Sequence, residues 1–286
     1  MPNIRIHAWG GLGSQLFAVA LAQDIQQKFP KRRIRVILHT GGVTHRTPEV
    51  TSLFPQWTYE FVDDFKKTSS SGSSEKLTRR IDSATRSRGL IKRLIFGLGI
   101  ASSCDSNEDF EKVRPWLIFV RGHYSYRTIN PFFLSDLNHR IHQDLPPLDL
   151  TNSCAIHYRL GDLLALKEKG PISSALLVSE FLSLAKRYDF DRLLIFSDSP
   201  NEAKSSFEIV HNIEVVAPNV ATVQVMAYSI DAKFFIGTSS KVSFWISGMR
   251  AQVLQKPSLL PSNNLAQFGG IVGLASNLIS TYVVNE

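Results

Sequence analysis

Cysteine is scarce in this sequence: Cys104 and Cys154 are the only two among 286 residues, and they lie far apart. This pattern argues against a disulfide scaffold and against a cysteine zinc site, because both need several suitably spaced cysteines. The opening residues also lack the charged and then apolar segments of a signal peptide. No apolar run approaches the ~20 residues that span a bilayer. We therefore expect a protein of the reducing cytoplasm without a membrane anchor.

Charged residues are also sparse, at 20% of the chain, whereas 43% of the residues are hydrophobic. Such a composition excludes a disordered polymer and is typical of a globular α/β protein. The net charge of +7 suits an anionic partner, such as a sugar nucleotide, a lipid pyrophosphate, an anionic membrane surface or a nucleic acid.

A basic stretch at residues 76–93 precedes the apolar segment LIFGLGI. One interpretation is a peripheral contact with an anionic membrane, at the inner face where polyprenyl-linked acceptors are found. The other is a solvated helix face or a surface insertion. No interleaved aromatic residues accompany these charges, so we do not expect a nucleic-acid partner.

The first forty residues predict a strand, a glycine-rich loop, a helix and a second strand. Residues 4–9 and 34–39 are β-prone, and Ser14 stands where a helix N-cap is expected. An apolar residue then recurs every four positions, which indicates one helical stripe. Its members are Phe17, Leu21, Ile25 and Phe29. This β–loop–α–β unit is typical of nucleotide-binding folds.

The glycine loop in GGLGSQLF can let a phosphate approach the backbone at a helix N-terminus. We therefore predict a phosphate site at this loop, which comprises Gly11, Gly13, Ser14 and Gln15. The alternative is that the glycines only turn the chain. A dinucleotide fingerprint is not supported, because Leu16 replaces its third glycine and no acidic residue ends the second strand.

The paired prolines of residues 144–152 indicate a linker, and strands alternate with helices beyond it. Alternating strands and helices imply parallel sheets. We therefore predict an α/β protein with two Rossmann-like domains whose parallel sheets face each other across a cleft. Residues 1–148 would form the first domain. Residues 149–286 would form the second, with a terminal helix that can pack back on the first.

Polar residues follow three predicted strands of the second half, in AIHYRLGD, IFSDS and FFIGTSSKVSFW. Ligands of open α/β sheets bind outside such strand ends, where arginine can hold a pyrophosphate bidentately. The candidate residues are His157, Arg159, Asp162, Ser197, Asp198, Thr238, Ser239 and Ser240.

A diphosphate bound at such strand ends needs its charge stabilised, by a metal or by fixed donors. The single D-x-D string, residues 189–191, precedes its strand and lies at the wrong edge for a metal site. We therefore expect no metal and no other cofactor. Asp162 and His157 are candidates for a general base, and each is equally suited to orienting Arg159.

The order and the residues of these motifs resemble those of the α1,2-fucosyltransferase (glycosyltransferase family 11-like) family. Its G-G-L-G-N-Q-M-F signature resembles residues 10–17, with Ser14 in place of asparagine. Its H-x-R-R-G-D motif resembles residues 157–162, with Leu160 in place of the second arginine. Its F-S-D-D motif is similar to residues 196–199.

Two further family motifs resemble the chain more loosely. S-N-S-S-F-S-W-W is echoed by residues 237–245, where Lys241 and Val242 interrupt the aromatic run, and G-Y-F-Q by residues 122–125. The resemblance implies a metal-independent enzyme of the glycosyltransferase-B (GT-B) kind. Such an enzyme would transfer L-fucose from GDP-β-L-fucose, with inversion, to a galactose 2-hydroxyl of a surface polysaccharide or lipopolysaccharide.

By the same resemblance, Arg159 would contact the diphosphate, Ser239 and Ser240 would lie near the phosphates, and residues 11–15 would face the donor. The domain of residues 1–148 would be the acceptor side, and the domain of residues 149–286 would bind the nucleotide sugar. The departures at Leu160 and near Trp245 leave two alternatives open. One is a GT-B transferase with another sugar-nucleotide donor. The other is a protein that binds GDP or a sugar without turnover.

Overall fold

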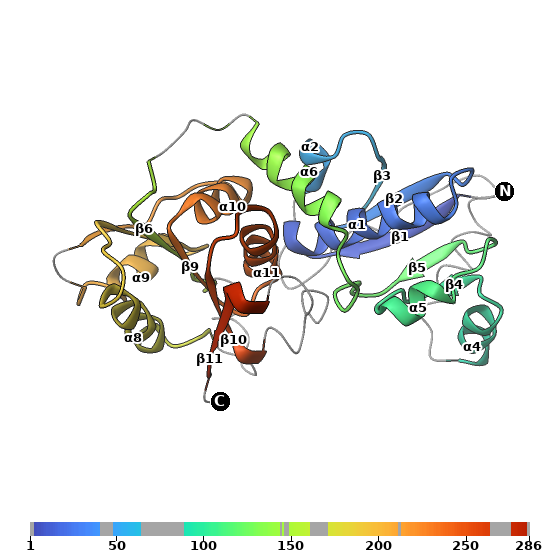
Figure 1. The fold of residues 1–286 in the computed structure, drawn as a ribbon. Coiled ribbons are helices and arrows are strands. Elements are labelled where there is room, and N and C mark those ends of the chain that lie inside the picture. Colours follow the sequence, from blue (N-terminus) through green and yellow to red (C-terminus); the bar gives the residue numbers. More distant parts are fainter. Residues whose placement is uncertain are drawn as a thin grey trace. The chain divides into compact units, whose positions relative to one another are not determined.

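The computed structural model describes residues 3–40, 48–63, 89–143, 145, 149–160, 171–210, 213–263 and 276–284. The chain divides into two compact units, Met1–Arg127 and Thr128–Glu286, each built around its own parallel sheet (Figure 1). In the described part of the chain, no helix is both long enough and apolar enough to cross a membrane.

The sheet of the first unit has five strands in the order β3-β2-β1-β5-β4, and every pairing is parallel. Its strands are β1 (Ile4–Trp9), β2 (Ile34–His39), β3 (Thr58–Val62), β4 (Ala101–Ser102) and β5 (Phe119–Arg121). The helices are α1 (Leu12–Lys28), α2 (Val50–Leu53), α4 (Leu90–Gly97) and α5 (Asn107–Glu111). The predicted strands at 4–9 and 34–39 are confirmed.

Helix α1 begins one turn earlier than predicted. Gly11 is its N-cap, because the Gly11 carbonyl already accepts the N–H groups of Ser14 and Gln15 at 2.9 and 3.2 Å. The prediction of Ser14 as the N-cap is therefore wrong, and Gly13 and Ser14 lie in the first turn. The apolar stripe is confirmed, since Phe17 and Ile25 are fully buried.

The sheet of the second unit has six parallel strands in the order β11-β10-β9-β6-β7-β8. These are β6 (Ser153–His157), β7 (Arg192–Phe196), β8 (Glu214–Val216), β9 (Phe234–Gly237), β10 (Ser258–Pro261) and β11 (Ile279–Tyr282). The helical elements are α6 (Pro131–His142), α8 (Ser174–Ala185), α9 (Pro200–Ser205), α10 (Thr222–Asp231), α11 (Lys241–Met249), η1 (Arg250–Leu254) and η3 (Ser276–Leu278).

The division between the units falls at Arg127/Thr128, about twenty residues before the predicted boundary at 148/149. Helix α6 accounts for the difference, because it packs against α10, α11 and η1. Its Phe133 ring lies 5.7 Å from Trp245, and His142 Nε2 lies 3.2 Å from Asp231 Oδ1. The paired prolines of residues 144–152 therefore follow a helix that already belongs to the second unit.

A fully buried arginine, Arg250, links the end of α10 to the segments that precede β9 and β10 by hydrogen bonds. Its guanidinium donates to the carbonyls of Ser229, Ile230 and Ala232 at the end of α10, at 2.9, 2.9 and 2.6 Å. It also donates to the Lys233 carbonyl at 3.0 Å and to the Pro257 carbonyl at 2.8 Å. Burial lowers the pKa of Arg250 to about 9.

Candidate functional site

The predicted residues of the second unit gather at one edge of its sheet. Strand β6 lies between β9 and β7, and all three run parallel, so their carboxyl ends meet. His157 ends β6, Gly237 ends β9 and Phe196 ends β7. The structure thus brings the segments 157–160, 197–199 and 238–240 to adjacent strand ends, as the sequence predicted.

The loop that carries Arg159 is fastened to both neighbouring strand ends. On the β9 side, the Thr238 hydroxyl donates to the His157 carbonyl at 2.8 Å, and the Arg159 N–H lies 3.4 Å from Thr238 Oγ1. On the β7 side, the Leu160 N–H donates to Asp198 Oδ1 at 2.8 Å. These hydrogen bonds hold the backbone on each side of Arg159. The point from which the Arg159 side chain extends is therefore preorganised.

His157 is joined to the start of helix α11. Its Nδ1 lies 2.8 Å from Ser243 Oγ, which also accepts the Thr238 N–H at 3.2 Å. Ser243 was not predicted as a site residue. Its place in the first turn of the helix that follows residues 238–240 could have indicated it. The Ser243 hydroxyl can donate to Nδ1 or accept from it, so this contact holds the imidazole ring in place in either tautomer.

The environment of His157 favours its neutral form. Burial lowers its pKa to about 4, Asp198 opposes this shift, and the Arg159 charge adds to it. A group with so low a pKa is a weak base, so this arrangement favours a hydrogen-bonding role toward a ligand over base catalysis.

The stability of the second unit should therefore depend on His157 below neutral pH. The pKa is depressed from 6.5 in the folded state, so the unfolded chain binds the proton first as the pH falls. The stabilisation is present above pH 6.5 and is lost toward pH 4. We expect His157→Gln to flatten the decline of Tm over this range, measured by scanning calorimetry. His139→Gln, on the exposed face of α6, is the control, and superimposable profiles for His157→Gln and wild type would refute this role.

Leu160 replaces an arginine of the family motif, and the structure gives a physical reason for an apolar residue there. Its side chain is only 5% exposed and belongs to the hydrophobic core with Tyr158, Ile172 and Phe207. An arginine at position 160 would have to bury its charge in this core or displace the loop. The core side of the loop is thus apolar, and Arg159 is the partly exposed cation of this segment.

Helix α11 presents its N-terminus to the same edge. Ser240 is the N-cap and accepts the Val242 N–H at 3.2 Å, while Ser239 Oγ donates to Asn263 Oδ1 at 3.1 Å. Gly237 leaves no room for a side chain, since an added Cβ would lie 2.5 Å from Leu260 Cδ2 and 2.7 Å from Ser243 Cβ. The N-terminus of this nine-residue helix directs the partial positive charge of the helix dipole toward the edge, where it favours an anion.

Ser197 and Asp198 serve the local structure at the end of β7. The Ser197 hydroxyl accepts the Ser199 N–H at 3.1 Å, which shapes the turn into α9. Asp198 is exposed and positions the Arg159 loop through Leu160. Asp162, predicted to act in catalysis or to brace Arg159, lies outside the described residues.

The glycine loop of the first unit follows β1 at the carboxyl edge of its own sheet. Gly10 has φ +96°, a conformation that favours glycine, and an added Cβ would lie 3.0 Å from Ser14 Oγ. Among the described residues, no atom lies within 4 Å of a Cβ added to Gly11, so they leave room for a ligand beside its backbone.

Gln15 has a structural role in this loop. Its side chain is 3% exposed, donates to the Gly10 carbonyl at 3.1 Å and accepts the Val50 N–H at 3.1 Å. The side-chain amide therefore holds the glycine loop against the start of α2. We infer that Gln15 positions the loop, while direct donor contacts would come from the backbone near Gly11.

An aromatic group at the same edge of the first sheet was not predicted. The Trp9 ring stacks on His39 at 4.1 Å and on His7 at 5.7 Å, and His7 Nδ1 lies 2.9 Å from His39 Nε2. The Arg121 guanidinium lies 5.1 Å from the Trp9 ring centre. The alternation in IHAW places His7 and Trp9 on one face of β1, which was the available signal.

Metal-ligating residues do not cluster in the described segments: no group of three or more His, Cys, Asp or Glu side chains could hold an ion there. The D-x-D string lies where the sequence predicted, before β7 at the amino edge. Its Phe190 is buried, and the Asp191 N–H donates to the Asn152 carbonyl at 3.1 Å.

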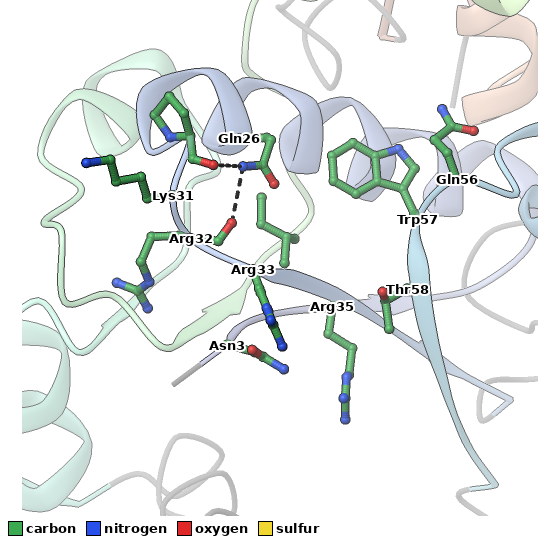
Figure 2. A pocket seen from close by; sticks show the side chains of 11 residues that line it. Asn3, Gln26, Lys31, Arg32, Arg33, Arg35, Gln56, Trp57 and Thr58 are labelled. Carbon is green, nitrogen blue, oxygen red and sulfur yellow. Dashed lines mark hydrogen bonds between the residues drawn. The ribbon is translucent and has the colours of Figure 1, made fainter. Parts of the chain in front are cut away.

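Figure 2 shows a pocket of about 420 Å³ in the first unit. Its lining includes Lys31, Arg33, Arg35 and Trp57, and Gln26 donates to the Pro30 and Arg32 carbonyls at 2.9 and 3.1 Å. The lining residues precede or begin β2 and β3, so this pocket lies at the amino edge. The glycine loop follows the opposite, carboxyl edge.

No protein-family model and no curated protein matches the sequence. Solved structures match its fold. Staphylococcus aureus MnaA, solved with UDP, is 9% identical with a TM-score of 0.52, over 99% of this chain and 85% of that chain. A putative UDP-N-acetylglucosamine 2-epimerase from Listeria monocytogenes is 9% identical with a TM-score of 0.51, and the match covers 100% of this chain and 85% of that chain. E. coli heptosyltransferase WaaC with ADP is 13% identical with a TM-score of 0.49, and the match covers 99% of this chain and 93% of that chain.

At these identities the likeness establishes the fold. The chain has an α/β, GT-B-like fold with two parallel sheets, of five and six strands. The predicted fold class is confirmed.

Proposed function

We propose that this protein is an inverting glycosyltransferase that moves L-fucose from GDP-β-L-fucose to a hydroxyl of a glycan. One observation carries the proposal: the Arg159 loop is fastened by Thr238 and Asp198 beside the N-terminus of α11. A cation and a helix N-terminus at adjacent strand ends form a set of donors suited to a diphosphate. The GT-B-like fold and the motif order support the same class of reaction.

The proposed reaction is a single displacement. The acceptor oxygen forms a bond to the anomeric carbon while the bond from that carbon to the β-phosphate oxygen breaks, and GDP leaves with both electrons. Arg159 and the α11 N–H groups would stabilise the charge that develops on the diphosphate. The acceptor hydroxyl loses its proton in the same step, to Asp162 or to solvent. Neutral His157 would orient a bound ligand by hydrogen bonding rather than accept this proton.

Fucose as the donor sugar and a galactose 2-hydroxyl as the acceptor rest on the resemblance to α1,2-fucosyltransferases. The acceptor would be a surface polysaccharide or a lipopolysaccharide repeat. A GT-B transferase with another nucleotide is the second candidate. The fold favours testing UDP sugars in particular, because MnaA, which shares it, was solved with UDP.

Transfer should proceed without a metal ion, because Arg159 and α11 supply the positive charge. We expect release of GDP from GDP-fucose in the presence of a β-galactoside, with EDTA changing the rate by less than about twofold. A coupled GDP assay measures the rate, and NMR of the product gives the linkage and anomeric configuration.

The matched comparison uses UDP-galactose as donor with an assay for released UDP, and transfer from that donor would support the second candidate. GDP release without a new glycan would indicate hydrolysis, and no release with any acceptor would favour a binding protein. A strict requirement for Mg²⁺ or Mn²⁺ would contradict the arginine-based mechanism.

A further inference from the structure

The first unit exposes a continuous group of large apolar side chains that its fold does not use. Among the described residues, five of the eleven exposed large hydrophobic side chains lie on or beside α4. They are Leu90 (83% exposed), Ile91 (62%), Leu94 (62%), Leu98 (54%) and Trp116 (55%), and we call them the α4 patch. Such a concentration on a single short helix marks an interaction surface.

Most apolar side chains of α4 do not reach the sheet. The helix buries only Ile95, which packs with Ala101 and Phe119 against the edge of the sheet. Leu90 and Leu94 lie about 140° and 100° around the helix axis from Ile95, while Ile91 and Leu98 flank Ile95 one turn before and after it and are still exposed. Helix α4 covers the end of the sheet at β4, the last strand in the order (Figure 1).

The end of α4 is built to hold Trp116 in the patch. Gly99 has φ +70°, and its N–H donates to the Phe96 carbonyl at 3.0 Å, which ends the helix. Trp116 Nε1 then donates to the Leu98 carbonyl at 2.8 Å. The polar atom of the indole is thus satisfied by the protein while over half of the side chain stays exposed. Tryptophan in this setting is characteristic of the boundary between lipid headgroups and acyl chains.

Cations border the apolar side chains. Arg93 and Arg114 are exposed, and Lys92 lies 5.6 Å from the Phe96 ring centre. The four carboxylates between α4 and Arg114 are engaged elsewhere. Glu108 pairs with Lys112 at 2.5 Å and Glu111 with Lys28 at 3.3 Å, while Asp105 accepts the Tyr124 N–H at 2.9 Å and Asp109 the Ser103 hydroxyl at 2.7 Å. An apolar helix face with a basic border is complementary to an anionic lipid surface.

We propose that the α4 patch docks the first unit on an anionic membrane. The apolar side chains would enter the headgroup region while Lys92, Arg93 and Arg114 contact lipid phosphates. This inference gives the basic segment of the sequence a defined partner, and only its residues 89–93 are needed. It is independent of the donor and acceptor, because docking requires no nucleotide.

Vesicle flotation of the full chain tests the proposal. We expect wild type to float with vesicles of phosphatidylcholine and phosphatidylglycerol, and much less with phosphatidylcholine alone. The double variant Ile91→Glu/Leu94→Glu should lower partitioning by about tenfold or more, because it removes two apolar anchors and adds negative charge. Ile209→Glu is the matched control, since Ile209 is 64% exposed in the second unit.

Two further measurements keep the test decisive. Binding should shift the tryptophan fluorescence to the blue, and Trp116→Phe should remove most of that shift. Arg93→Glu/Arg114→Glu should weaken flotation without altering the circular dichroism spectrum. Equal flotation of the I91E/L94E variant and wild type would overturn the proposal. So would absence of vesicle binding combined with a sedimentation change in that variant, which would identify a second copy of the chain as the occupant.

Discussion

Arg159→Ala should abolish detectable fucose transfer and weaken GDP binding by more than about tenfold, since a charge-assisted hydrogen bond contributes roughly 1.5–3 kcal/mol. The expected loss in transfer exceeds the loss in binding, because charge on the diphosphate grows in the transition state. Initial rates with GDP-fucose and calorimetric titration with GDP measure the two effects separately.

Two controls make this result specific. Arg192→Ala removes an exposed arginine that pairs with Glu214 at 2.7 Å on the amino side of β7, and it should leave both parameters unchanged. Arg159→Lys keeps the charge but loses the bidentate geometry, so it should fall between wild type and alanine. Unchanged kinetics in Arg159→Ala would remove this residue from the mechanism.

Arg250→Met should cost the largest share of stability of any substitution considered, about 3–5 kcal/mol. The variant keeps much of the side-chain volume but leaves the carbonyls at the end of α10, and that of Pro257, without their donor. Each buried carbonyl that loses its hydrogen-bond donor lowers the free energy of unfolding, and this substitution removes the donor of several carbonyls together. Urea unfolding followed by circular dichroism measures the change.

The control is Arg140→Met, which removes a surface arginine paired with Asp136 one turn away on α6. Such exposed pairs contribute ~0–1 kcal/mol, so little change is expected. A loss below about 1 kcal/mol for Arg250→Met would show that water or neighbouring donors replace the guanidinium.

Regular segments of the fold could be predicted from the sequence because their signals are local. Strands β1 and β2 read as β-prone runs, and both are confirmed at their predicted bounds. Strand β3 was missed, since its residues are partly exposed and do not alternate in burial. Strand β10 was missed because it ends in Pro261 and follows Pro257, which read as loop signals.

The errors at boundaries have a common physical cause. The start of α1 is set by the Gly11 backbone rather than by the side chain of Ser14, and propensity alone favours serine as a cap. The unit boundary is set by the packing of α6, which no linker composition reports. The local backbone thus determines where α1 begins, and tertiary packing determines where the two units divide.

The candidate site was predictable as a set of strand ends but not as a network. Parallel strands place Arg159, Asp198 and Thr238 at one edge from topology alone. The bond from Leu160 N–H to Asp198, and the contact of His157 with Ser243, depend on side-chain geometry that a sequence does not contain. The burial of Leu160, which explains its departure from the family motif, likewise emerges only from packing.

The most direct test of the central claim is calorimetric titration of the metal-free protein with GDP, GDP-fucose, GDP-mannose and UDP-galactose. We predict selective binding of GDP and GDP-fucose, and a loss of that binding in Arg159→Ala. Binding of none of the four nucleotides, or equal binding to wild type and Arg159→Ala, would contradict the assignment of this edge of the second sheet as a diphosphate site.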